Sequence, residues 1–308
     1  MNRVTITCPV ENISVEKLLN WAKRYDVFTL LNSNSHSNNQ TDNYSNFDVL
    51  LAVDPVEIFM YEDLFHALKF ISDSNDWYIL HLSYDLKNKI ETLSSTNPDK
   101  INFPEFIIYR PAVVFEIREK KLFVHYIQEK YSPEEINLFI EQIKVQEPDQ
   151  STKGTEIRID QRLSRDEYIS EINEIKQHIQ RGDIYEMNYC QEFYSEHATI
   201  DPFQTYLDLN EISPMPYSVF SKYNEHFLMC ASPERYLAKR GQKIISQPIK
   251  GTARRDSNPE EDKLIAERLF HDEKERSENV MIVDLVRNDL SRTAKKGSVN
   301  VEELFGIK

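Results

Sequence analysis

Of all the residues in the sequence, Lys250 has the neighbouring residues that most favour a catalytic role. It follows the apolar run IISQPI and precedes a Gly-Thr turn, Gly251 and Thr252. A lysine that acts as a nucleophile must lose its proton, and a reference pKa of about 10.4 leaves little neutral amine at pH 7. Burial, or the nearby Arg254 and Arg255, could lower that pKa. A strand-end lysine that reaches solvent is the alternative. The Gly-Thr turn favours the catalytic role over the solvent-exposed one. Glycine lets a ligand come close to the backbone, and threonine supplies a hydroxyl group.

Two glutamates could act beside this lysine. Glu234, in CASPERYL, follows a Ser-Pro pair. It could be a general acid that protonates a departing hydroxyl group, or a turn glutamate on the surface. Glu278 shares a helical face with apolar residues in SENVMIVDLVRNDLSRTA. It could be a ligand of Mg²⁺, which prefers carboxylate oxygen, or an interior carboxylate paired with Arg276 or Arg287.

The elements that would position these residues are helices and antiparallel strands. Ser164 as N-cap, isoleucines at helical spacing and Gly182 as a stop predict a helix over SRDEYISEINEIKQHIQRG. Asn258 and Pro259 begin a second helix, and SENVMIVDLVRNDLSRTA forms a third. An antiparallel hairpin is predicted over EFIIYRPAVVFEIREKKLFVHYI, and strands at IYEMNYCQEFY, PYSVFSKY, HFLMCAS, RYLAKR and KIISQPI. The predicted fold class is α+β, with helices packed on antiparallel β-sheets.

The sequence divides into two regions, 1–150 and 155–308, at the linker VQEPDQSTKGTEIR, which has no apolar period. Within the first region, LNSNSHSNNQTDNYSN is a predicted surface loop. In the predicted strand IYEMNYCQEFY, Glu186 and Asn188 share the polar face, so that the strand could line a cleft.

Composition excludes several classes of function. The 308 residues are 40% hydrophobic, enough for a sizeable core, and a net charge of -14 disfavours nonspecific binding to nucleic acid or an anionic membrane. The three cysteines form no CxxC pair, so neither a disulfide framework nor a zinc site is indicated. Six glycines assemble neither a GxGxxG nor a P-loop motif. Without a signal-peptide core or a run of membrane-spanning length, a cytoplasmic protein is expected.

Five blocks occur in the order and spacing typical of the chorismate-utilising enzymes, which include anthranilate synthase component I and aminodeoxychorismate synthase component I. They are GDIYEMNYCQEF, NEISPMPYSVF, SPERYL, QPIKGTARR and ENVMIVDLVRNDLSR. The sequence resembles this family from Gly182 to Arg292. The segment FTLLNSN resembles one that helps to form a tryptophan pocket. The resemblance implies the fold of anthranilate synthase component I.

Within the family, PIKGT resembles the aminodeoxychorismate synthase branch, whose product 4-amino-4-deoxychorismate leads to para-aminobenzoate and folate. The resemblance implies that Lys250 adds covalently to the chorismate ring as the 4-hydroxyl group leaves, and that ammonia then displaces it. It further implies that Glu234 is the general acid/base and Glu278 a Mg²⁺ ligand, while Gly251 and Thr252 contact the substrate.

Glu186 departs from the family pattern. Isochorismate and salicylate synthases carry a lysine at the similar position to activate water, and amine-transferring members usually carry glutamine. A glutamate there weighs against water as the nucleophile but leaves its role open. No cysteine lies in a nucleophile-elbow setting, so we expect ammonia to come from a separate glutamine amidotransferase subunit.

Family members continue beyond a segment like GSVNVEELFGIK into a region with a GAPK-like motif, a second magnesium-binding glutamate and the groups that hold the enolpyruvyl carboxylate. The resemblance therefore predicts a member shortened at its C-terminus, which would be inactive as the 308-residue chain. Anthranilate synthase component I is the alternative enzyme, against which Lys250 counts. A noncatalytic remnant that keeps the fold and the tryptophan pocket is the alternative from another class.

Overall fold

The computed structural model describes residues 2–34, 44–60, 64–147 and 157–307, which form two compact units. Unit 1 comprises Met1–Gly154 and Ile200–Pro233, and unit 2 comprises Thr155–Thr199 and Glu234–Lys308. The two units therefore do not coincide with the predicted regions 1–150 and 155–308. Ile200–Pro233 lies in the second region but contributes two strands to the sheet of unit 1. Residues 35–43 of the predicted surface loop and 148–156 of the predicted linker lie outside the described residues.

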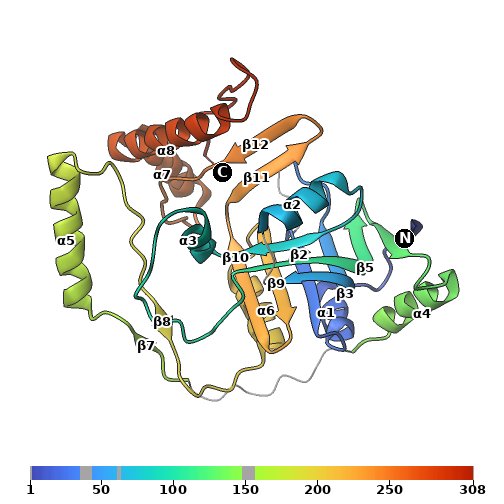
Figure 1. Ribbon diagram of the computed structural model, residues 1–308. Coiled ribbons are helices and arrows are strands. Elements are labelled where there is room, and N and C mark those ends of the chain that lie inside the picture. Colours follow the sequence, from blue (N-terminus) through green and yellow to red (C-terminus); the bar gives the residue numbers. More distant parts are fainter. Residues whose placement is uncertain (1, 35–43, 61–63, 148–156, 308) are drawn as a thin grey trace. The chain divides into compact units, whose positions relative to one another are not determined.

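Unit 1 is built on one eight-stranded sheet (Figure 1), in the order β1-β6-β5-β3-β2-β9-β10 with β4 paired to β5. All of these pairings are antiparallel. The strands are β1 (Arg3–Pro9), β2 (Val27–Asn32), β3 (Val49–Met60), β4 (Ile79–Leu82), β5 (Phe106–Arg118), β6 (Lys121–Ile127), β9 (Tyr217–Tyr223) and β10 (His226–Ser232).

The predicted hairpin is confirmed as β5 and β6. Arg118 pairs with Lys121, and the two residues between them, Glu119 and Lys120, both have positive φ angles, of 51° and 60°. A two-residue turn with positive φ at both positions matches the right-handed twist of the flanking strands.

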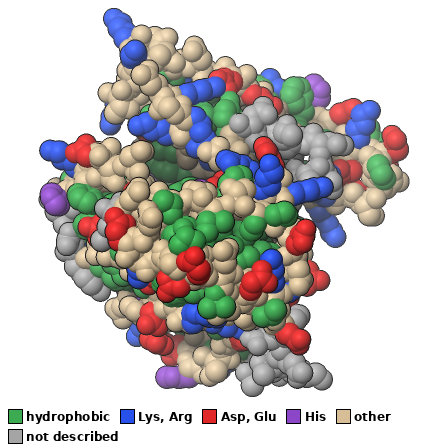
Figure 2. All heavy atoms as spheres, turned by 90° about the vertical axis from the view of Figure 1, so that its right-hand side faces the viewer, with side chains coloured by type: hydrophobic (Ala, Val, Ile, Leu, Met, Phe, Trp, Pro, Cys, Tyr) green, Lys and Arg blue, Asp and Glu red, His purple; other side chains and the backbone are tan. Residues whose placement is uncertain are grey.

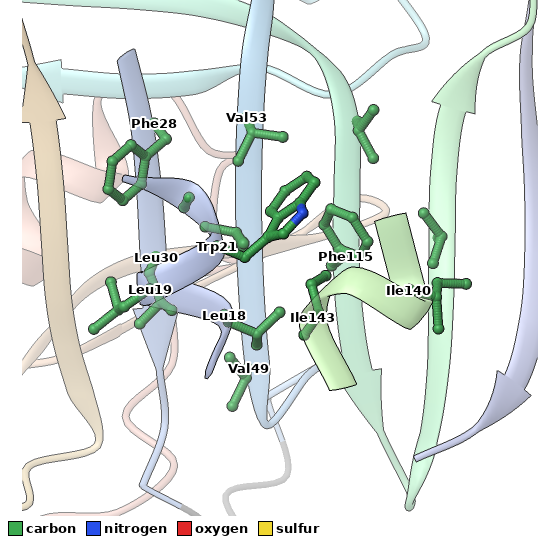
Figure 3. Packing of buried hydrophobic residues seen from close by; sticks show 14 of the residues in the cluster. Leu18, Leu19, Trp21, Phe28, Leu30, Val49, Val53, Phe115, Ile140 and Ile143 are labelled. Carbon is green, nitrogen blue, oxygen red and sulfur yellow. The ribbon is translucent and has the colours of Figure 1, made fainter. Parts of the chain in front are cut away.

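The helices α1 (Val15–Ala22), α2 (Leu64–Asp73), α4 (Pro133–Lys144) and α6 (Pro202–Ile212) contribute buried side chains to unit 1. The short 3₁₀ turn η1 (Tyr84–Leu86) contributes Leu86, and the four-residue α3 (Lys87–Ile90) contributes none. Figure 3 shows Trp21 of α1 against Phe115 of β5, with ring centroids 5.3 Å apart, and Ile143 of α4 beside them. The indole N–H of Trp21 donates to Gln142 Oε1 at 3.1 Å, so the buried ring keeps a polar partner.

Over residues 157–199 and 234–307, unit 2 contains two short sheets and three helices. Its elements are β7 (Asp160–Gln161), α5 (Arg165–Arg181), β8 (Phe193–Tyr194), β11 (Arg235–Arg240), β12 (Lys243–Gln247), α7 (Pro259–His271) and α8 (Glu273–Ser291). The predicted caps of α5 are confirmed: Ser164 forms a capping box with Glu167, and Gly182 is left-handed at φ 82°. Asn258 caps α7, whose first residue is Pro259. Helix α8 begins four residues before the predicted Ser277 because Asp272 caps it.

The predicted strand IYEMNYCQEFY is wrong over most of its length. Only Phe193–Tyr194 forms a strand, paired with Asp160–Gln161, and the segment before it is irregular. Tyr185, Met187 and Phe193 of the predicted apolar face are exposed, Tyr185 by 83%, whereas Tyr189 and Glu186 are half-buried. The alternating pattern occurs here without a neighbouring strand to complete a ladder, so most of the predicted apolar face is not packed.

Acidic and basic side chains are interspersed with hydrophobic ones on the face that Figure 2 shows. Exposed apolar side chains are a normal part of a protein surface. Among the helices of the described residues, none has the length and apolar character that a membrane span needs.

Candidate active site

Lys250 lies in unit 2, in the irregular segment that follows β12, and its amine is not directed freely into solvent. It forms an ion pair with Glu186 and donates a hydrogen bond to the same carboxylate. Its Nζ also lies 3.3 Å from Asn188 Oδ1 and 3.6 Å from Glu278 Oε1. The side chain is 19% exposed. The structure thus brings together a lysine and two glutamates from three separate segments of unit 2.

The surroundings of Lys250 act on its pKa in the direction opposite to the expected one. The hydrogen bond to Glu186 raises the pKa of Lys250; burial opposes this shift, and the negative charges of Glu186 and Glu278 add to it. Arg255, which was expected to lower the pKa, instead forms an ion pair of 2.7 Å with Asp262 at the start of α7. Carboxylates surround the amine, so the structure holds Lys250 as an ammonium.

Glu186 uses only one of its two carboxylate oxygens. Oε1 accepts the hydrogen bond from Lys250, whereas Oε2 is buried and has no hydrogen-bond partner among the described residues. The side chain is 21% exposed. A buried acceptor without a donor is costly, and such atoms in a native structure call for an explanation.

Glu278 lies on α8 between two lysines rather than beside an arginine. Its carboxylate oxygens are 3.6 Å from Lys250 Nζ and 3.7 Å from Lys274 Nζ. The alternative pairing with Arg276 or Arg287 is wrong, since Arg287 pairs with Asp284 at 3.0 Å and Arg276 lies over aromatic rings.

The predicted magnesium site has one recognisable ligand. Within 2–34, 44–60, 64–147 and 157–307, no three acidic, histidine or cysteine residues gather in a way that could hold a metal ion. Glu278 supplies carboxylate oxygens, but lysines occupy its surroundings on both sides. The described residues therefore do not by themselves make a magnesium site, and the assignment of Glu278 stays a prediction.

Gly251 and Thr252 follow Lys250 directly. Gly251 is half-buried and has φ +80°, a left-handed conformation that glycine adopts at little cost. A Cβ placed on it would lie 3.0 Å from Glu275 Oε2 and 3.2 Å from Glu275 Cβ, so the turn packs closely on α8. Thr252 is exposed.

Glu234 is not among the partners of Lys250 but leaves the same end of the β11–β12 hairpin. It immediately precedes β11, whose first residue Arg235 pairs with Gln247, the last residue of β12. Glu234 is exposed. The register brings the two candidate segments to one end of the hairpin without bringing the two side chains into contact.

Sequence reasoning missed Glu275 as a neighbour of this site and gave no partner role to Asn188. Glu275 contacts Lys274 at 3.0 Å as well as the turn at Gly251. Its position three residues before Glu278 was a usable signal, because residues at i and i+3 share a helix face. Asn188 was expected on the polar face with Glu186, and both reach Lys250.

The segment proposed to form a tryptophan pocket, Phe28–Asn34, lies in unit 1. Strand β2 pairs with β9, and beyond its end the Asn34 side chain donates to Asn210 Oδ1 and to the Met215 carbonyl oxygen, both at 2.8 Å. Asn34 has φ 54°. Two of the sequence segments named in the resemblance, FTLLNSN and NEISPMPYSVF, are therefore adjacent, and the tryptophan pocket itself stays a prediction.

Comparison with known proteins identifies close relatives over most of the chain. It is 32% identical over 234 residues to anthranilate synthase component 1 of Thermus thermophilus, covering 74% of this chain and 50% of that protein. It is 31% identical over 237 residues to aminodeoxychorismate synthase component 1 of Bacillus subtilis, with the same coverage of 74% and 50%. The chain thus spans about half the length of the curated relatives it matches.

Solved structures support the fold. Anthranilate synthase component I from Streptococcus pneumoniae superposes with a TM-score of 0.66 at 24% identity, covering 82% of this chain and 63% of that one. The predicted fold, a mixture of helices and antiparallel sheet resembling anthranilate synthase component I, is confirmed. The family model described as chorismate binding enzyme matches residues 20–308. The chain belongs to the chorismate binding enzyme family.

Proposed function

We propose that this protein is an aminodeoxychorismate synthase component I, which converts chorismate and ammonia into 4-amino-4-deoxychorismate for para-aminobenzoate and folate synthesis. The observation that carries the proposal is Lys250, a half-buried lysine beside a glycine turn, in a member of a chorismate-binding family. The PIKGT sequence around it favours this branch over the anthranilate branch.

In the proposed reaction, the Lys250 ammonium first passes a proton to the Glu186 carboxylate, its hydrogen-bond partner. The raised pKa of Lys250 makes this transfer uphill in the structure as it stands. The neutral amine then forms a C–N bond with the chorismate ring, while Glu234 gives a proton to the 4-hydroxyl group, which leaves as water.

In the second half of the reaction, the lone pair of ammonia forms a C–N bond at C4. The bond between the ring and Lys250 breaks, and its electron pair returns to the Lys250 nitrogen, which then takes back the proton held by Glu186. The new ammonium group on the product gives one proton to the Glu234 carboxylate, which restores the general acid.

The proposal also includes Mg²⁺, with Glu278 as one of its ligands. When bound, the magnesium ion would neutralise charge on the substrate carboxylates. Ammonia would come from a separate glutamine amidotransferase subunit, and the protein would work in the cytoplasm. Gly251 and Thr252 would contact the substrate. Tryptophan would bind beside β2 in unit 1.

Anthranilate synthase component I is a second candidate, because a relative of that name matches as well as one named aminodeoxychorismate synthase component 1, at 32% and 31% identity. The two reactions start from chorismate and differ in product. Chromatography of a reaction with chorismate, Mg²⁺ and ammonium chloride distinguishes anthranilate from 4-amino-4-deoxychorismate directly.

The test of the proposal is the Lys250→Arg variant of this protein. Arginine keeps the positive charge beside Glu186 but does not deprotonate, so ammonia-dependent product formation should fall at least about a thousandfold. Lys243→Arg is the matched control, because Lys243 lies on β12 and pairs with Glu302 at 2.5 Å. Unchanged turnover by Lys250→Arg would exclude the covalent role, whereas an adduct of chorismate on Lys250 in mass spectrometry would support it.

A further inference from the structure

Three polar side chains on one face of the unit 1 sheet form a hydrogen-bonded series. Thr5 of β1 lies directly opposite His125 of β6, and its Oγ1 is 2.9 Å from His125 Nδ1. The other ring nitrogen, Nε2, is 2.9 Å from Glu116 Oε2 on β5. Glu116 pairs in register with Phe123, two residues before His125, so the pleat places all three side chains on the same face.

The carboxylate of Glu116 sets the direction of this series. Glu116 is 5% exposed and also pairs with Arg118 at 3.4 Å. A carboxylate paired in this way accepts hydrogen bonds, so the proton of a neutral His125 ring lies on Nε2. Nδ1 then keeps its lone pair, and the Thr5 hydroxyl group donates to it. This order of hydroxyl group, imidazole base and orienting carboxylate is the one that activates serine and threonine nucleophiles.

The surroundings of Thr5 and His125 leave room for a ligand. Both residues line an open hollow of about 380 Å³, together with Trp77 and Asn75. Trp77 packs against the His125 ring, with ring centroids 5.3 Å apart, and so restricts the orientation of the imidazole. Thr5 and Asn75 are exposed. The hydroxyl group is therefore accessible, and the Asn75 amide supplies N–H donors that can stabilise an oxyanion.

We propose that Thr5, His125 and Glu116 form a second reactive site, at which the Thr5 hydroxyl group takes an acyl group from a small carboxylic ester and passes it to water. The site goes beyond the proposed function, because these three residues lie in unit 1 and Lys250 lies in unit 2. Thr5 and His125 touch the reacting atoms, and Glu116 positions His125.

The first half of this reaction acylates the protein. The Thr5 oxygen forms a bond to the ester carbonyl carbon while its proton passes to His125 Nδ1. The bond between that carbon and the alcohol oxygen then breaks, and the alcohol leaves with the proton from Nδ1. While His125 is doubly protonated, the Glu116 carboxylate stabilises its positive charge.

The second half restores the protein. A water oxygen forms a bond to the acyl carbon as one water proton passes to His125 Nδ1. The bond between the acyl carbon and Thr5 then breaks, its electron pair returns to the Thr5 oxygen, and that oxygen takes the proton from Nδ1. The carboxylic acid leaves, and no oxidant or metal is needed.

The first test uses p-nitrophenyl acetate and the 308-residue chain. We expect release of p-nitrophenol together with an acetyl group on Thr5, located by fragmentation of its peptide in mass spectrometry. The same peptide carries Cys8, which is half-buried. Acetylation of Cys8 in place of Thr5, or no acetylation of Thr5, would overturn the site.

Thr7 provides the matched control for Thr5. It is exposed, lies two residues further along the same face of β1, and pairs in register with Phe123 rather than with a histidine. Thr5→Val should abolish acetylation at position 5, whereas Thr7→Val should leave acetylation of Thr5 unchanged. Thr5→Ser keeps the hydroxyl group and should keep the reaction. Equal release of p-nitrophenol by wild type and by a folded Thr5→Val would overturn the proposal.

The second test concerns His125 and Glu116 and needs no ester. Nitrogen-15 NMR of the histidine rings, under conditions where the His125 ring is neutral, shows which nitrogen carries the proton, with the resonances assigned by their loss in His125→Gln. We expect the proton on Nε2, and its movement toward Nδ1 in a share of the molecules of Glu116→Gln. His125→Gln should also slow the acetylation of Thr5 about a hundredfold, the size expected for loss of a general base. A proton on Nδ1 in wild type would make Thr5 the acceptor and would overturn the site.

Discussion

A Cβ on Gly251 would come to 3.0 Å from Glu275 Oε2 and 3.2 Å from Glu275 Cβ. The turn after Lys250 thus rests on the first turn of α8, three residues before Glu278. Two constraints act on one residue, because Gly251 also has φ +80°. Nothing larger than hydrogen fits there without movement of the turn or of α8, both of which carry candidate site residues.

Gly251→Ala should therefore disturb the site more than the same substitution at Gly241, in the turn of the β11–β12 hairpin. Gly241 is the matched control: its φ is 58°, but nothing lies within 4 Å of a Cβ placed on it. Both variants should lose about 1 kcal/mol of stability from the positive φ, and Gly251→Ala should lose about 1 kcal/mol more from crowding. Chemical denaturation measures the difference. Equal losses would mean that the turn moves away from Glu275 without cost.

Glu234→Gln should lower kcat more than it raises the KM for chorismate. A group that protonates a leaving hydroxyl acts mainly in the transition state, so its loss appears in the rate. A fall in kcat of about a hundredfold is the expected size for a general acid. Steady-state kinetics of the variant and of the wild-type protein provide the measurement. An unaltered kcat with a raised KM would assign this exposed glutamate to substrate binding instead.

Local signals predicted the parts of the fold that depend on neighbouring residues. Ser164 and Gly182 bound α5 as expected, because each acts on the helix end beside it. The strand at Ile184–Tyr194 was expected from alternation alone, and alternation does not supply the neighbouring strand that a ladder needs. The strands β2 and β9 pair although they are far apart in the sequence, and no local sequence signal predicts such a pairing. For this reason the sequence did not assign Ile200–Pro233 to unit 1.

The candidate site was predicted by residue type but not by partner. The sequence identified Lys250, Glu186 and Glu278 as candidate residues, but it did not predict the ion pairs between them. Lys250 and Glu186, for example, are 64 residues apart in the sequence. The direction of the Lys250 pKa depended on those partners. Sequence neighbours such as Arg255 were a poor guide, because their side chains turn to other carboxylates.

Asp76 makes the stability of unit 1 sensitive to acid. Burial alone would raise the pKa of Asp76, but hydrogen bonds from Arg3, the Trp77 amide and Arg110 together outweigh it and lower that pKa below its ordinary value of 3.8. Arg110 Nε lies 2.6 Å from Asp76 Oδ2. The carboxylate therefore contributes stability that is present above the unfolded pKa and is lost as the pH falls through the lower folded pKa.

Asp76→Asn should accordingly cost about 2–3 kcal/mol of stability near neutral pH and much less below the folded pKa, where wild-type Asp76 is protonated. Urea unfolding of wild type and variant between pH 2 and pH 7 measures the difference. Asp73→Asn is the control, since this exposed residue ends α2. A penalty that does not change with pH would show that the ion pairs of Asp76 do not account for it.

Backbone amides of α8 should exchange with solvent much faster than those of the central strands of unit 1. Helices α5, α7 and α8 contribute no buried side chain, and the buried side chains of the described part of unit 2 are Arg235, Ala238 and Ile245. Leu285 of α8 is 56% exposed. Few buried contacts mean a small free energy of local opening, whereas β3 and β5 open only with the core of unit 1.

Hydrogen exchange followed by mass spectrometry tests this for the 308-residue chain, with peptides from α8 compared with peptides from β3. Exchange in α8 should be at least about a hundredfold faster, which corresponds to a difference in opening free energy of roughly 3 kcal/mol. Because Glu278 lies on α8 and Lys250 does not, opening of α8 would break the ion pair between them more often than the core of unit 1 opens. Equal protection of α8 and β3 would show that interactions other than side-chain burial hold unit 2 together.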